Sequence, residues 1–114
     1  MEHIDKPWGY EEILETNGNY TLKRLFMKPG ESCSLQYHVK KRETIYVVQG
    51  KLHVQLSYLG EDLRSHILYP NDTLTILPTV VHRMTGVVGG CLYLEASTSE
   101  LDDVVRLEDN YGRV

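Results

Sequence analysis

Four side chains that can bind a metal ion are spaced along the chain so that they can reach one centre: Gln36, His38, Glu43 and His82. Residues two apart on a strand project from the same face, so Gln36 and His38 can point together, and a reversal across residues 39–42 would bring Glu43 beside them. An amide oxygen, two imidazoles and a carboxylate suit zinc, manganese, iron or nickel, whereas two nitrogens disfavour calcium. The spacing predicts a divalent metal site, completed by His82 from a second hairpin.

The elements that would position these residues are short strands. Runs rich in β-branched and aromatic residues cover 20–27, 32–38, 44–48, 52–56, 63–68, 73–77, 80–84 and 91–96. Turn-forming residues gather between them, at 17–19, 29–30, 49–51, 59–62, 70–72 and 86–90. This pattern predicts an all-β sandwich or barrel. One short helical turn is expected within residues 99–106, with Ser99 as its cap.

Two segments resemble the sequence motifs of the cupin family. Residues 30–50 read G-x5-Q-x-H-x4-E-x6-G, similar to the first cupin motif, G-x5-H-x-H-x3,4-E-x6-G, with Gln36 in place of the first His. Residues 71–86 resemble the second motif, G-x5-P-x-G-x2-H-x3-N, through His82, but Asn71 and Thr79 stand where the motif has Gly, and its Pro and Asn are also replaced. The resemblance implies a cupin fold, a double-stranded β-helix or jelly-roll barrel with short terminal extensions.

A second resemblance covers most of the chain and is to the isomerase domain of type II mannose-6-phosphate isomerases. It is carried by residues 6–11, 22–25, 29–30, 34–38, 82–83 and 102–113. It implies a metal-dependent interconversion of mannose 6-phosphate and fructose 6-phosphate, and type I enzymes likewise bind zinc through a Gln, two His and a Glu. Lys40 and Lys41 stand where the family has a His followed by an Arg. In that family the domain follows a nucleotidyltransferase; here residues 1–114 are expected to form one domain without that partner.

This reaction needs a base beside the carbon acid and an electrophile at the carbonyl. Glu95 falls where the isomerase-like pattern has its Glu, and a carboxylate inside a barrel acquires a raised pKa, so Glu95 is the predicted base. Lys23 and Arg24 are further catalytic candidates, although neighbours on a strand cannot both face inward. Arg83 and Lys40 are predicted to bind the phosphate of the substrate, with Lys41 or Arg42 of the same turn as alternatives to Lys40.

Two other functions remain open from the sequence. One is another cupin enzyme, such as an oxygenase that holds iron in the same site. The other is a cupin that binds a sugar or a metal without catalysis, which the altered second motif would suit. The basic residues and the family-like C-terminal segment favour the isomerase.

Composition disfavours nucleic acid and membrane as partners, and the isomerase resemblance implies a small-molecule sugar phosphate. The net charge of −4 disfavours nucleic acid, and no apolar run approaches the roughly 20 residues that span a bilayer. An N-terminus unlike a signal peptide and two isolated cysteines, Cys33 and Cys91, predict a cytoplasmic protein. Tyr46 and Val48 would give the outer face of their strand an apolar character, which predicts a homodimer. His3 is expected in a mobile terminus, and His53 and His66 on the surface.

Overall fold

The computed structural model describes residues 1–58 and 61–114, and within these residues the chain forms strands and no helix. The strands are β1 (Glu2–Lys6), β2 (Gly9–Thr16), β3 (Thr21–Met27), β4 (Leu35–Tyr37), β5 (Glu43–Ser57), β6 (Arg64–Leu68), β7 (Thr73–Ile76), β8 (Val81–Ser97) and β9 (Val105–Glu108). All neighbouring strands pair in antiparallel fashion. The predicted all-β class is confirmed. No described segment is a helix long and apolar enough to cross a membrane.

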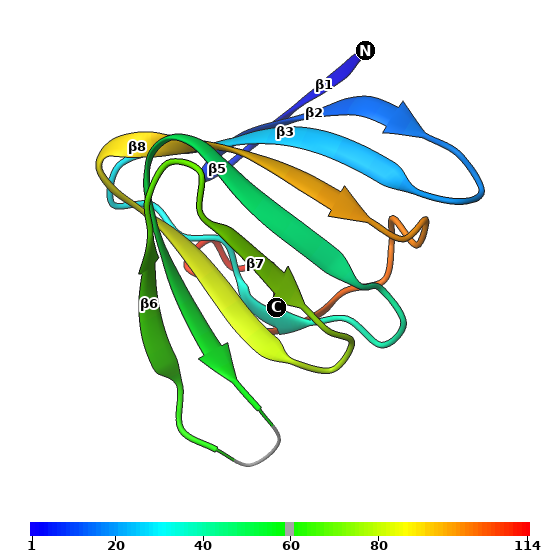
Figure 1. Cartoon of the computed structure of the whole chain (residues 1–114). Helices are drawn as coiled ribbons and strands as arrows, with labels where there is room; N and C mark the ends of the chain where they lie inside the picture. Colours follow the sequence, from blue (N-terminus) through cyan, green and yellow to red (C-terminus); the bar gives the residue numbers. More distant parts are fainter. Residues whose placement is uncertain (59–60) are drawn as a thin grey trace.

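Two long strands, β5 and β8, connect the two walls of one curled sheet (Figure 1). The first half of β5 and the second half of β8 belong to a wall ordered β1-β2-β3-β8-β5-β7. Their other halves belong to a wall ordered β6-β5-β8-β4-β9. The walls enclose a common interior, as in the double-stranded β-helix that the motifs predicted.

At two of the predicted turns, the structure shows bends within β5 and β8 instead. Residues 49–51 and 86–90 do not end their strands; both chains continue through them, with register shifts after Val47 and Gly50. A bulge lets a strand bend without leaving the ladder, which is why turn-forming residues occur inside a strand here. Gly50 has φ 84°, and a Cβ on it would lie 2.1 Å from the carbonyl oxygen of Gly90, so this close crossing requires glycine. The turn predicted at 59–62 includes residues outside the described part.

The ends of the chain also differ from the sequence-based expectation. β1 and β2 were not predicted, and His3, expected in a mobile terminus, lies in β1 with its ring 3.2 Å from Glu12 on β2. The helical turn predicted within residues 99–106 is wrong: a turn at residues 101–102 leads into β9. β9 pairs with β4, whose edge would otherwise expose unpaired backbone groups.

Alternation along β5 separates the interior from the surface as predicted. Glu43, Ile45 and Val47 are buried, while Tyr46 and Val48 are 37% and 42% exposed. The side chains that fill the interior come from both walls and include Met27, Leu52, Val54, Ile76, Met84 and Tyr93. The exposed apolar pair fits the predicted homodimer, which stays a prediction.

Candidate metal centre

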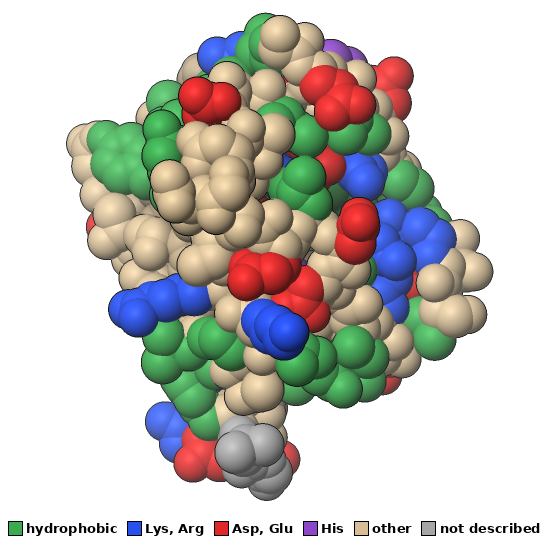
Figure 2. Space-filling view, turned by 90° about the vertical axis from the view of Figure 1, so that its right-hand side faces the viewer, with side chains coloured by type: hydrophobic (Ala, Val, Ile, Leu, Met, Phe, Trp, Pro, Cys, Tyr) green, Lys and Arg blue, Asp and Glu red, His purple; other side chains and the backbone are tan. Residues whose placement is uncertain are grey.

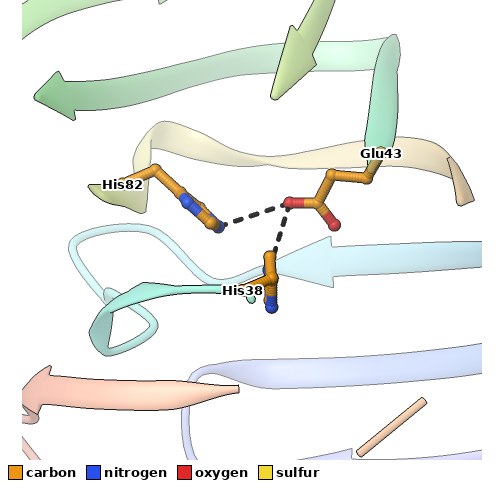
Figure 3. A group of neighbouring side chains, drawn as sticks. All are labelled: His38, Glu43 and His82. Carbon is orange, nitrogen blue, oxygen red and sulfur yellow. Dashed lines mark ion pairs between the residues drawn. The ribbon is translucent and has the colours of Figure 1, made fainter. Parts of the chain in front are cut away.

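Three of the four predicted metal ligands meet inside the barrel. His38 directly follows β4, Glu43 begins β5, and His82 lies near the start of β8. Figure 3 shows the two imidazoles and the carboxylate pointing toward one another from these separate elements. The three residues are only 4%, 2% and 0% exposed, so water cannot readily solvate their polar atoms.

The distances between these side chains fit a shared cation. Glu43 Oε1 lies 3.3 Å from His82 Nε2 and 3.6 Å from His38 Nε2, and all three atoms are buried without a hydrogen-bond partner. Ligand atoms about 2.0–2.2 Å from a tetrahedral zinc ion lie roughly 3.3–3.6 Å apart, which matches the two carboxylate–imidazole distances. The ligand atoms of all three residues lie within 4.8 Å of one another, so these buried atoms without a hydrogen-bond partner could hold a metal ion.

The other ring nitrogens orient the two imidazoles. His38 Nδ1 lies 2.5 Å from the carbonyl oxygen of Asp103, and His82 Nδ1 lies 3.0 Å from that of Val80. A carbonyl oxygen can only accept a hydrogen bond, so each Nδ1 carries the proton and donates, and in the neutral ring the lone pair of each Nε2 faces the centre. This is the tautomer that binds a metal.

The carboxylate of Asp103 fixes the loop of residues 39–42, which connects His38 to Glu43. It accepts hydrogen bonds from the backbone N–H groups of Val39, Lys40 and Lys41, at 3.0, 2.7 and 2.8 Å. These bonds lower the pKa of Asp103 to about 2, so the carboxylate stays ionised at neutral pH. The reversal across residues 39–42 is therefore fixed from the C-terminal segment.

Gln36, the fourth predicted ligand, lies beside the other three. It is the direct cross-strand partner of His82, and paired residues project from the same face. Its Oε1 accepts a hydrogen bond from Ser34 Oγ at 2.5 Å, which leaves this oxygen a second lone pair. Its role as a ligand stays a prediction.

A buried lysine links the centre to the predicted base. Lys41 Nζ lies 3.1 Å from Glu95 Oε2 and 3.3 Å from Glu43 Oε2, and the lysine is 6% exposed. The sequence analysis gave the phosphate-binding role to Lys40, whose side chain is exposed and does not line the cavity. Lys41 was one of the residues of this turn, with Lys40 and Arg42, that were considered for phosphate binding, and it stands where the family has an Arg.

The two buried carboxylates differ in charge state. Burial, and to a smaller extent the charge of Glu43, raises the pKa of Glu95 to about 7, although the charges of Lys41 and Lys23 oppose this shift. Burial alone would also raise the pKa of Glu43, but the facing imidazoles and Lys41 hold it well below its usual range. Glu43 is therefore a firmly ionised ligand, whereas Glu95 can exchange a proton near neutral pH.

Strand parity decides between Lys23 and Arg24. Lys23 is buried, is the cross-strand partner of Glu95, and lies 3.6 Å from Glu11 through its Nζ. Arg24 projects from the opposite face, where its Nε donates to Glu12 at 2.8 Å. The proposed catalytic role of Arg24 therefore does not fit the structure, because its side chain does not line the cavity.

Alternation along β8 also places the side chain of Arg83 on the outer face of the sheet. Because its neighbour His82 faces inward, Arg83 faces outward, where its Nε donates to the carbonyl of Cys33 at 3.1 Å. Neither Arg83 nor Lys40 lines the cavity, so the structure does not support the phosphate contacts predicted for these two residues.

The centre opens into a cavity of about 130 Å³. This volume holds several water molecules, so it can admit the reacting end of a small polar ligand beside the metal site. Besides the residues described above, its lining includes Lys6, Trp8, Leu101, Val104, Arg106 and Arg113. On the face shown in Figure 2, acidic and basic side chains are interspersed, and basic side chains adjoin one another at its right-hand side.

Comparison with known proteins identifies the family. Residues 1–109 match the sequence model of the family described as "Mannose-6-phosphate isomerase C-terminal". The chain belongs to this family. The mannose-6-phosphate isomerase C-terminal family thus accounts for nearly the whole chain, as the resemblance implied.

Curated relatives of this family member are much longer proteins. The chain is 34% identical to the mannose-1-phosphate guanylyltransferase ManC of Salmonella typhimurium, over 97% of this chain and 23% of that protein. It is 34% identical to the alginate biosynthesis protein AlgA of Pseudomonas aeruginosa, over 96% of this chain and 23% of that protein. The chain spans about a quarter of the length of these relatives.

Solved structures confirm the predicted fold of this family member. The capsular polysaccharide assembling protein CapF from Staphylococcus aureus superposes with a TM-score of 0.85 at 15% identity, over 94% of this chain and 34% of that one. KdgF from Halomonas sp. superposes with a TM-score of 0.76 at 19% identity, over 90% and 91% of the two chains. At these identities the likeness shows the fold alone.

The altered second motif keeps the backbone conformation of its missing glycines. Asn71 and Thr79, which stand at the two Gly positions, have φ 74° and 71°. The N–H of Thr79 donates to the carbonyl of His38 at 2.6 Å, so this left-handed turn also supports a metal ligand. A β-branched residue is strained in this region, where L-residues pay roughly 1–2 kcal/mol.

We therefore expect Thr79→Gly to stabilise this family member. The strain that is relieved should exceed the free-energy cost of the additional freedom that glycine gives the unfolded chain. The free energy of unfolding should therefore rise by about 1 kcal/mol. Urea denaturation measures the change. Thr73→Gly in β7 is the control, and it should lower the midpoint because its backbone is already extended. A lower midpoint for Thr79→Gly would show that no strain is stored there.

Proposed function

We propose that the chain is a metal-dependent sugar-phosphate isomerase that interconverts mannose 6-phosphate and fructose 6-phosphate. The observation that most supports this proposal is that the candidate metal centre of His38, Glu43 and His82 adjoins a cavity that also contains the buried Lys41–Glu95 pair. Lys41 contacts both Glu43 of the centre and Glu95. Membership of the mannose-6-phosphate isomerase C-terminal family supports the assignment.

A bound divalent cation would polarise the sugar carbonyl and orient the sugar oxygens. Glu95 takes the proton from C2 of the aldose and returns it to C1, which its pKa of about 7 allows at neutral pH, while the proton of the C2 hydroxyl passes to the oxygen on C1, so that C2 becomes the carbonyl of the ketose. The charged Lys41 beside Glu95 stabilises the oxygen anion of the enediol that forms between these steps. Lys23, paired across the strands with Glu95, helps to position this carboxylate.

The assay is to incubate purified protein with mannose 6-phosphate and measure fructose 6-phosphate, after loading with zinc, manganese, ferrous iron or nickel in turn. We expect product with at least one metal, and none after chelation. Oxygen uptake by the iron-loaded protein without isomerisation would favour an oxygenase. Sugar phosphate binding with no turnover under any metal would make this a binding protein.

A further inference from the structure

The basic side chains around the cavity differ in whether they have an acidic partner. Among the basic residues of the described part of the chain, Lys6 and Lys23 lie 3.8 and 3.6 Å from Glu11, and Lys41 lies between two carboxylates. Arg113 binds Asp109 through two bonds of 2.8 Å. Their charges are largely balanced within the protein.

Arg106 differs from these residues. It lines the cavity, yet within residues 1–58 and 61–114 it makes no ion pair, and its Nε is buried without a hydrogen-bond partner. The residue as a whole is half-buried, but a buried guanidinium N–H without an acceptor is costly. The missing partner is an acceptor, and an anion matches the charge.

The sheet places Arg106 at a defined distance from the metal centre. Gln36 on β4 is the cross-strand partner of His82 on β8 and of Arg106 on β9. The three residues therefore form a row across the wall and project from the same face. Strands are about 4.8 Å apart, so the backbone of Arg106 lies roughly 10 Å from that of His82.

This separation suits a ligand with a reactive carbonyl at one end and an anion at the other. In a hexose 6-phosphate the phosphate is at the opposite end of the carbon chain from C1 and C2. With the carbonyl end at the metal centre, the phosphate can extend toward β9. The planar guanidinium group is suited to bidentate binding of phosphate oxygens.

We propose that Arg106 is the residue that binds the phosphate group of the substrate, in the role that the sequence analysis gave to Arg83 and Lys40. This inference deepens the proposed isomerase function and rests on it for the identity of the sugar. The binding of an anion by Arg106 does not require turnover, so the two claims can fail separately.

The test compares Arg106→Gln with Arg64→Gln, which removes an exposed arginine from β6 in the same wall. Arg106→Gln should raise KM for mannose 6-phosphate by about 10- to 100-fold while kcat changes less than about threefold, as expected for loss of a charge-assisted contact remote from the reacting carbons. Arg64→Gln should leave both values unchanged. Arg106→Lys, which keeps the charge and loses the planar fork, should fall between wild type and Arg106→Gln.

Calorimetry with inorganic phosphate gives a readout besides activity. The metal-loaded wild-type protein and Arg64→Gln should bind phosphate, and Arg106→Gln should bind it at least about tenfold more weakly. Wild-type affinity in Arg106→Gln, or no phosphate binding by the wild type, would overturn the inference. Arg106-dependent phosphate binding in a protein that never isomerises the sugar would refute the proposed function and leave this subsite standing. If Arg106→Gln does not fold, the same two measurements on Arg106→Lys decide.

Discussion

Replacing His82 with alanine is expected to remove most bound metal while the barrel stays folded. The substitution deletes one of three buried ligand atoms, so metal affinity should fall by on the order of 100-fold or more, since even loss of a supporting residue costs 10- to 100-fold. The interior is held by apolar side chains from both walls, and Glu43 keeps Lys41 as a partner at 3.3 Å. Mass spectrometry of the metal content, with circular dichroism for folding, measures both effects.

His38→Ala should behave in the same way, because its Nε2 faces the same carboxylate oxygen. The matched control is His66→Ala, which removes an exposed imidazole from β6. Its metal content should equal that of the wild type. Full metal occupancy in both His38→Ala and His82→Ala would show that the ion is bound elsewhere.

Glu95→Gln should retain the metal and lose turnover. The amide occupies nearly the same space and can still accept a hydrogen bond from Lys41, but it cannot take a proton at neutral pH. Loss of a general base typically costs about 10²- to 10⁴-fold, so kcat for mannose 6-phosphate should fall by this amount. Stopped assays of fructose 6-phosphate cover this range.

Glu12→Gln is the control for this change. Glu12 lies on β2 and pairs with Arg24 on the outer face, away from the cavity. Its turnover should stay within about twofold of wild type, as for most surface substitutions. A Glu95→Gln variant with wild-type kcat would assign proton transfer to another group.

The predictable part of the site is local in the sequence. His38 and Glu43 were found from a motif whose members lie within one strand and the following reversal, where parity and loop length fix the geometry. His82 was found because the second motif kept its His although its glycines are replaced. The structure shows why this replacement was tolerated, since Asn71 and Thr79 adopt the left-handed conformation themselves.

The part that the sequence did not reveal depends on pairing between distant segments. Nothing near Arg106 indicates that β9 adds to the edge of β4, so its place beside Gln36 could not be anticipated. Lys41 was hidden within a Lys-Lys-Arg run that is typical of a solvated turn, and it is buried because Asp103 draws this turn inward. Parity correctly allowed one of Lys23 and Arg24 to face the interior, but only the register showed which.

The most direct measurement is anomalous diffraction from crystals of the metal-loaded protein, collected at the absorption edge of the bound metal. The account predicts one peak per chain within about 2.0–2.3 Å of Nε2 of His38, Nε2 of His82 and a carboxylate oxygen of Glu43, with the amide oxygen of Gln36 completing the set. A peak at another place would contradict it. So would metal-loaded protein in which no ion lies between Glu43 and the two imidazoles.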